Sequence, residues 1–267
     1  MENIRKYGLP PYRIAVVHGG PGAQGGMAEV AAELSSTAGV IEPIQKERNI
    51  KNEIEELHGL IAAHGSLPVV LIGHSWGAWL SVLTAASYPG DVSKLILVSS
   101  APFEEVYAES IHATRMKRLT PAERAELSSV LQVFSSGMTR AARDTADRLS
   151  TLTLKSDSYD LKEEPRRAGA ETIDSAIFKS VWGEASELRR SGKLLVEAKK
   201  LACPVVAIHG DSDPHPADGV KIPLAKTVEN FRFIMLERCG HYPWREKHAA
   251  EKFYDILKSE LNLAIHR

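Results

Sequence analysis

The sequence alternates short apolar runs with amphipathic stretches, and this alternation limits the possible folds more than any other feature. The run Pro68–Ile72 is continuously apolar, which predicts a strand buried on both faces of a sheet. The stretch after this run carries apolar residues at helical spacing, namely Trp79, Val82, Leu83 and Ala86. Strands that alternate with helices indicate an α/β fold, with a mostly parallel sheet and helices on both of its faces.

The same alternation extends over both ends of the chain. Further strands are expected at Arg13–Val17, Val40–Ile44, Lys94–Val98, Pro204–Ile208 and Arg232–Leu236. Between residues 103 and 200 the alternation stops, charged residues become denser and no strand is evident. We therefore interpret residues 103–200 as an inserted helical cap, and residues 1–102 and 201–267 as the core that carries the sheet.

Composition excludes several classes of protein. A chain of 267 residues that is 43% hydrophobic, with a net charge of −1, can bury a large core and has no basic field for nucleic acid or an anionic membrane. No apolar run approaches the roughly 20 residues of a membrane helix, and no apolar leader opens the chain. The two cysteines, Cys203 and Cys239, suffice for neither a disulfide framework nor a cysteine-rich zinc site. Cys203 opens one expected strand and Cys239 follows the end of a neighbouring parallel strand, so we expect them at opposite edges of the sheet, with both thiols free. These features predict a cytoplasmic protein.

One motif lies between the apolar run and the helix after it. Gly73–Gly77 reads Gly-His-Ser-Trp-Gly and matches the pattern G-x-S-x-G. In a nucleophile elbow, a sharp turn between strand and helix holds such a serine above the edge of the sheet, so Ser75 is the candidate nucleophile. The alternative is a glycine-lined turn with a passive serine.

A glycine-rich loop follows the first expected core strand. His18–Gly22 reads His-Gly-Gly-Pro-Gly, and such a loop leaves backbone N–H groups free to stabilise an oxyanion. We assign one donor to Gly20 and the other to Trp76, the residue after the candidate nucleophile. A purely structural turn is the alternative, whereas the phosphate-binding glycine patterns are absent from the sequence.

Two further loops follow strands near the end of the chain. Gly210–Pro216 contains two carboxylates, Asp211 and Asp213, and a later loop contains His241. A histidine in such a loop can reach over the strand ends and act as the general base. The chain order of serine, aspartate and histidine is the order found in one of the three common types of serine hydrolase.

The loop at Gly210–Pro216 has two other interpretations. It is either a solvated loop with Asx turns or a metal site that uses His209, Asp211 or His215. No further ligand pair has metal spacing, so we expect neither a metal nor an organic cofactor.

These residues give the chain a resemblance to the α/β-hydrolase superfamily. The resemblance is carried by His18–Gly22, Gly73–Gly77, Gly210–Pro216 and Gly240–Pro243. It implies Ser75 as nucleophile, His241 as base and Asp213 as the acid of the triad, with Asp211 as the less favoured acid. Members of this superfamily commonly begin with an antiparallel strand pair, and the few residues before Arg13 predict a sheet shortened at that edge.

The resemblance implies a hydrolase with a small-molecule substrate. Among such hydrolases, we favour a carboxylesterase. The loop at His18–Gly22 is similar to that of prolyl aminopeptidases, but their elbow carries Gly-Gly-Ser-Trp-Gly. An aminopeptidase would also need an acidic group in the cap, with Glu171, Glu184 and Glu187 as candidates. A ligand-binding protein without turnover is the alternative of another class.

The cap also supplies candidate residues for the substrate pocket. These are the aromatic side chains of Phe103, Tyr107, Phe178 and Trp182, for which ordinary core packing is the alternative. The sequence does not determine the oligomeric state.

Overall fold

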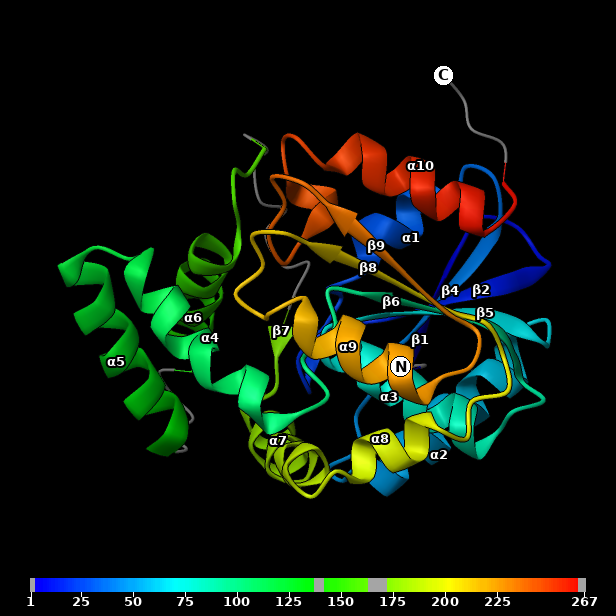
Figure 1. Cartoon of the computed structure of the whole chain (residues 1–267), viewed down its shortest axis with the longest axis horizontal. Coiled ribbons are helices and arrows are strands. Elements are labelled where there is room, and N and C mark those ends of the chain that lie inside the picture. The colour runs from blue at the N-terminus through cyan, green and yellow to red at the C-terminus, as the bar shows by residue number, and fades with distance from the viewer. Residues whose placement is uncertain (1–2, 137–141, 163–171, 264–267) are drawn as a thin grey trace.

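A seven-stranded sheet forms the centre of the computed structural model, which describes residues 3–136, 142–162 and 172–263 (Figure 1). Its strands lie in the order β1-β4-β2-β5-β6-β8-β9. In chain order they are β1 (Ile4–Tyr7), β2 (Tyr12–Val17), β4 (Gly39–Pro43), β5 (Val69–His74), β6 (Val92–Val98), β8 (Val205–Gly210) and β9 (Phe231–Leu236). Every neighbouring pair is parallel except β1 and β4. The α/β class with a mostly parallel sheet is therefore confirmed.

The edge strand β1 corrects one expectation. The residues before Arg13 were expected to leave the sheet short of antiparallel strands, but they supply one, which pairs Ile4 with Pro43 of β4. In this strand only Ile4 is buried, and the Tyr7 hydroxyl donates a hydrogen bond to Glu42 at 2.8 Å. One buried apolar side chain among polar neighbours is too weak a pattern to predict a strand.

Helices cover both faces of the sheet (Figure 1). One face carries α2 (Ile50–His64), α3 (Trp76–Ser87), α8 (Lys193–Ala198) and α9 (Asp218–Thr227), and the other carries α1 (Ala28–Leu34) and α10 (Ala250–Glu260). Successive strand residues point to opposite faces, so Ala15 and Val17 join the first core cluster while Ile14 and Val16 join the second. This two-sided burial explains why the strands read as continuous apolar runs.

The segment expected to form a cap is mainly helical. It contains α4 (Glu105–Lys117), α5 (Pro121–Ser136), α6 (Ala142–Asp157) and α7 (Ser175–Arg190). It also contains one short strand that the sequence did not indicate, β7 (Thr172–Ile173), which pairs with β3 (Ala23–Gln24) from the core segment. Helices α4, α5 and α6 project from one end of the sheet (Figure 1). They share a small apolar cluster that includes Leu119, Leu127 and Leu152. Helices α7 and α8 instead contribute Val181 and Leu194 to the main core. The division at residues 102 and 200 stays a prediction.

A capping box begins α5, as the sequence at residues 120–123 indicates. The Thr120 backbone N–H donates to Glu123 at 2.9 Å, and the Glu123 N–H donates to the Thr120 hydroxyl at 3.3 Å. Across the described ranges, no helix has both the length and the apolar character needed to cross a membrane.

Candidate active site

Ser75 occupies the sharp turn between β5 and α3. Its backbone has φ 53° and ψ −115°, a conformation that L-residues rarely adopt and that stores strain. The turn is possible because glycines flank it. A Cβ on Gly73 would lie 2.3 Å from the Gly77 oxygen, and a Cβ on Gly77 would lie 2.4 Å from the Val17 oxygen. Because α3 lies so close to the strands, only glycine fits at the first and last positions of the motif. The same packing holds Ser75 at the carboxyl edge of the sheet.

The two expected oxyanion donors lie beside this serine. Gly20 has φ +57°, so the loop after β2 turns sharply, and Gly20 lines the same cavity as Ser75. Trp76 is the first residue of α3, where backbone N–H groups have no acceptor within the helix. The N-terminus of a helix also favours negative charge.

Asp213 lies where it can orient His241. The Nδ1–H of His241 donates to Asp213 Oδ2 at 2.7 Å, and both side chains are buried. Asp211 has a different place: its carboxylate accepts the backbone N–H groups of Arg238 and Cys239 at 3.0 and 3.1 Å. Asp211 therefore ties together the loops after β8 and β9, whereas Asp213 contacts the candidate base.

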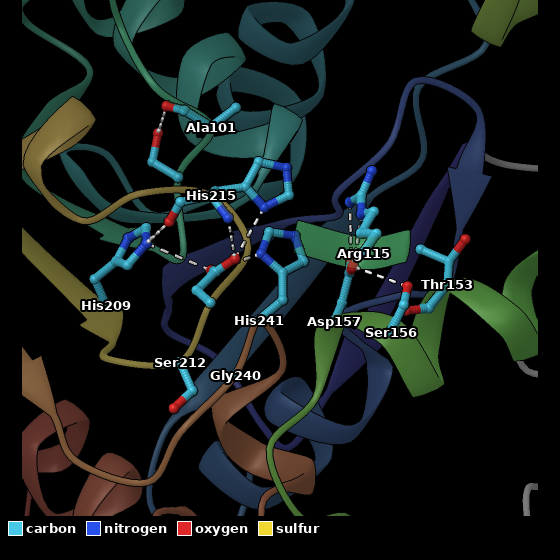
Figure 2. A network of polar contacts seen from close by, with 12 residues as sticks. Ala101, Arg115, Thr153, Ser156, Asp157, His209, Ser212, His215, Gly240 and His241 are labelled. Carbon is cyan, nitrogen blue, oxygen red and sulfur yellow. Dashed lines mark hydrogen bonds and ion pairs between the residues drawn. The ribbon is translucent and has the colours of Figure 1, made fainter. Parts of the chain in front are cut away.

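Asp213 also holds a second histidine. The Nδ1–H of His215 donates to Asp213 Oδ1 at 2.9 Å, and the His215 backbone N–H donates to the same atom at 2.8 Å. The rings of His215 and His241 stack with their centroids 4.3 Å apart (Figure 2). Nearby, His209 donates through Nε2 to the His215 carbonyl at 2.8 Å. One carboxylate thus orients two imidazoles and one loop.

Electrostatics keep this cluster in a defined protonation state. Burial tends to raise the pKa of Asp213, but attraction to His241 and His215 outweighs it and holds the pKa well below its usual range. Burial lowers the pKa of His215 to about 4, aided by repulsion from His241. At neutral pH, Asp213 is therefore an anion and His215 a neutral donor to it.

The loop that carries His241 is anchored on several sides. Its backbone N–H donates to the Asp157 carbonyl at 2.8 Å, and its carbonyl accepts a hydrogen bond from His74 Nε2 at 2.9 Å. Burial lowers the pKa of His74 well below its usual range, which keeps that imidazole neutral. The buried carboxylate of Glu246 accepts the N–H groups of Gly240, Tyr159 and Asp160 at 2.9, 2.8 and 2.8 Å. These contacts join the end of α6 to the loop after β9.

A cavity of about 310 Å³ opens over Ser75 and His241. The core supplies the loop at Gly19–Pro21 and the elbow. The cap supplies both apolar and polar side chains, namely Leu131, Leu149, Phe178, Trp182, Arg115, Ser150, Thr153 and Asp157. Within the described part of the chain, Ser75 makes no side-chain hydrogen bond, so its hydroxyl is free to respond to a bound ligand. Hydrogen bonds in an empty active site are often long and tighten when substrate binds.

An ion pair between two cap residues completes one wall of the cavity. Nε and Nη2 of Arg115 donate to the two carboxylate oxygens of Asp157, each at 2.6 Å (Figure 2). Such a bidentate pair is well oriented. Burial tends to lower the pKa of Arg115, but attraction to Asp157 outweighs this effect and raises it. The carboxylate in this wall is therefore already paired with a cation.

The structure brings some of the predicted pocket residues to the cavity and not others. Phe178 and Trp182 lie in its wall, with their rings stacked at 6.0 Å. Phe103 is fully buried against Trp79 in the core, and Tyr107 packs against Gly219 of α9. Among the described lining residues, neither Phe103 nor Tyr107 is present. Phe103 is therefore a core residue, whereas Tyr107 is half-buried beside α9 and belongs to none of the apolar clusters found among the described residues.

The acidic residues considered for an aminopeptidase have other partners. Glu184 accepts the backbone N–H of Ile50 at 2.9 Å, and Glu187 pairs with Arg190 on its own helix. Glu171 lies outside the described residues.

Two residues of the site, Arg115 and Asp157, were not assigned from the sequence, and the pairing of His215 with Asp213 was not foreseen. Arg115 and Asp157 lie on cap helices without a motif, and only the fold brings them to the strand ends. The sequence indicated His215 only as a possible metal ligand in the loop at Gly210–Pro216. Its position two residues after Asp213 was the feature that could have predicted their hydrogen bond. Both thiols are free, as expected.

The chain matches proteins of one family in sequence and in structure. The model of the alpha/beta hydrolase family matches residues 17–256. Monoacylglycerol lipase ABHD6 of Mus musculus is 24% identical over 248 residues, which cover 87% of this chain and 68% of that protein. VinJ has a similar structure, with a TM-score of 0.70 and 18% identity over 97% of this chain and 94% of VinJ. The structure of lip1 from Acinetobacter baumannii AYE has a TM-score of 0.65 and 18% identity, over 97% of this chain and 88% of that one.

Proposed function

The chain belongs to the alpha/beta hydrolase family and is a hydrolase, and on that premise we propose that it cleaves small carboxylic esters through an acyl-enzyme on Ser75. The observation that carries the proposal is the strained turn at Ser75, which faces one cavity together with His241. The hydrogen bond from His241 to Asp213 supports the role of His241 as base.

The proposed reaction has two steps. His241 Nε2 accepts the proton of Ser75 Oγ while Oγ attacks the ester carbonyl carbon, and the carbonyl oxygen becomes an oxyanion held by the N–H groups of Gly20 and Trp76. The imidazolium then protonates the departing alkoxide, which leaves as an alcohol and leaves an ester on Ser75. Water, deprotonated by His241, attacks that ester. The imidazolium then returns the proton to the departing Ser75 Oγ, which releases the acid and restores both side chains. Asp213 keeps Nε2 as the basic nitrogen throughout.

The cavity supports an ester with a small acyl group. Its volume of about 310 Å³ lies at the lower end of the range for ligand pockets. Asp157, the carboxylate in the wall, is engaged by Arg115, so a substrate ammonium would have to displace a bidentate partner. This arrangement favours an ester over the amino-terminal substrate of an aminopeptidase. We further propose that the protein acts in the cytoplasm.

Labelling with a fluorophosphonate, followed by peptide mass spectrometry, tests the proposal directly. We expect modification of Ser75 in the wild type, and none in Ser75→Ala. His241→Ala should slow the labelling strongly because the base is removed. A folded wild type that is not labelled at Ser75 would overturn the acyl-enzyme and favour a ligand-binding protein.

A substrate panel then separates ester from amide cleavage. We expect p-nitrophenyl esters of short acids to be hydrolysed faster than long-chain esters, and prolyl or other aminoacyl anilides to be poor substrates. Faster cleavage of the anilides would favour the aminopeptidase.

A further inference from the structure

Three buried side chains place potential metal ligands around one point in the active-site cavity. A carboxylate oxygen of Asp157 and one ring nitrogen each of His215 and His241 all lie within 4.8 Å of one another. The three side chains come from the end of α6, the loop after β8 and the loop after β9. All three residues line the cavity, so a small ion from solvent can reach them.

Both histidines present the same nitrogen to that point. Each donates its Nδ1–H to Asp213, which leaves the lone pair of Nε2 as the available ligand on each ring (Figure 2). The two rings are stacked, with their centroids 4.3 Å apart and an interplanar angle of 27°. A carboxylate that orients the far nitrogen of a ligating histidine is the usual outer shell of a metal site.

Asp157 is oriented in the same way. Arg115 donates to both of its oxygens, and Ser156 Oγ donates to Oδ1 at 3.2 Å. Each carboxylate oxygen has two lone pairs, so Asp157 can still bind an ion through an oxygen that also accepts from Arg115. The charged groups facing the point are Arg115, Asp157 and Asp213, and their sum is negative when both imidazoles are neutral. The site is thus suited to a cation.

We propose that Asp157, His215 and His241 form a binding site for a divalent transition-metal ion, Zn²⁺ in particular, and that the bound ion inhibits the enzyme. Two imidazoles and one carboxylate are a ligand set that Zn²⁺ accepts, whereas Mg²⁺ and Ca²⁺ prefer oxygen ligands. Tetrahedral bonds of about 2.1 Å place ligand atoms about 3.4 Å apart, so any pair of these atoms that now lies near the limit of 4.8 Å must move closer together. Water completes the coordination.

The bound ion would inhibit ester hydrolysis because it occupies the lone pair of His241 Nε2. His241 Nε2 cannot accept the proton of Ser75 Oγ while it is bonded to a metal. This part of the inference rests on the proposed esterase function, whereas metal binding itself does not. The two parts are therefore tested separately.

Binding is measured on Ser75→Ala, which retains all three ligands. Zn²⁺ is titrated against a chromophoric chelator, and we expect one equivalent to bind in the low-micromolar range or tighter. Co²⁺ gives a second readout without any further substitution, because its visible absorption reports four-coordinate nitrogen and oxygen ligation. Failure of both ions to bind the folded Ser75→Ala protein overturns the proposal.

Matched substitutions locate the ion. Added to Ser75→Ala, His215→Gln and Asp157→Asn should each weaken binding at least about tenfold. The controls are His248→Gln and Asp160→Asn, which change an exposed histidine and aspartate that pair with each other at 3.0 Å. They should bind Zn²⁺ as their parent does. Loss of binding in the controls, with binding retained in His215→Gln and Asp157→Asn, overturns the assignment.

Activity provides the last comparison. Zn²⁺ should inhibit ester hydrolysis by the wild type, EDTA should restore it, and the inhibition constant should match the dissociation constant of Ser75→Ala. Binding without inhibition of an active esterase overturns the inhibitory role. Absence of any ester hydrolysis counts against the proposed function alone, since the binding result is independent of it.

Discussion

At the scale of single residues, Asp213 organises the site. Its carboxylate accepts the Nδ1–H of His241 on one oxygen, and the Nδ1–H and backbone N–H of His215 on the other. An acceptor-only group is needed at this position because every group facing it is a donor. The side chain therefore determines the tautomer of both rings at once.

Replacement of this carboxylate by an amide should nearly abolish activity. Asp213→Asn places an N–H₂ group against a ring N–H, which turns the imidazole or forces the other tautomer. We expect kcat/KM for a p-nitrophenyl ester to fall by about 10⁴. Asp211→Asn is the matched control and should lose about tenfold or less, because Asp211 ties loops together without contacting His241. Equal losses in the two variants would contradict the assignment of the acid.

Glu53 of α2 gives a prediction about pH and stability. The side chain is fully buried, and burial raises its pKa from the usual 4.5 to about 8, against the effect of the nearby Trp76 indole. The unfolded chain releases this proton near pH 4.5, whereas the folded chain keeps it until about pH 8. The folded state binds more protons over that interval, so its stability falls as pH rises.

Glu53→Gln should remove the loss of stability that the wild type shows as pH rises from about 4.5 to about 8. The variant should match the wild type near pH 5 and exceed its free energy of unfolding by on the order of 3 kcal/mol at pH 8. Denaturant unfolding at several pH values measures the difference. Glu55→Gln, at an exposed position of the same helix, should show no such trend. A constant difference between Glu53→Gln and wild type would refute the buried, protonated carboxyl.

At the scale of elements, the approach of α3 to the sheet decides where the nucleophile lies. The two glycines of the motif are required because carbonyl oxygens occupy the space of a Cβ at both positions. Packing therefore requires the two glycines of the motif, and the proposed chemistry requires its serine.

Two glycine substitutions should therefore act in opposite directions. Gly77→Ala places a methyl group 2.4 Å from the Val17 oxygen and should destabilise the protein by more than about 3 kcal/mol. Gly59→Ala, on α2, meets no atom within 4 Å and should stabilise it by about 0.5–1 kcal/mol through helix propensity. Thermal unfolding compares them. A Gly77→Ala protein as stable as the wild type would show that the elbow can relax.

At the scale of the whole molecule, one buried carboxylate connects the cap to the core. Glu246 accepts N–H groups from Tyr159 and Asp160 on the cap side and from Gly240 beside His241. A charged acceptor satisfies all three donors, and an amide satisfies fewer of them.

Glu246→Gln should destabilise both the cap segment at Tyr159 and Asp160 and the loop at Gly240. We expect a loss on the order of 2 kcal/mol, with faster amide hydrogen exchange at Asp160 and at Gly240. The matched control is Glu251→Gln on the exposed side of α10. Faster exchange on one side only would mean that Glu246 does not couple the two segments.

The sequence predicts the core better than it predicts the site. Apolar runs revealed β2, β4, β5, β6, β8 and β9, of which the central strands are buried on both faces. They missed β1, where only Ile4 is buried, and the two-residue strands β3 and β7. Loops after strands revealed Ser75, Asp213 and His241 as candidates, since parallel strands end at one edge. Arg115 and Asp157 lie about forty positions apart on two helices of the cap segment, and nothing in local spacing indicates that they meet at the cavity.

The separate apolar clusters have a consequence for how this protein can evolve. Among the described residues, the cluster of Leu119, Leu127 and Leu152 shares no member with the two clusters that flank the sheet. Mutations in α5 and α6 can therefore reshape the wall at Leu131 and Leu149 without disturbing the packing that holds Ser75 at its turn. Substitutions on these helices can therefore change substrate preference while the turn at Ser75 stays as it is, provided that the contact from Asp157 to the His241 loop is kept.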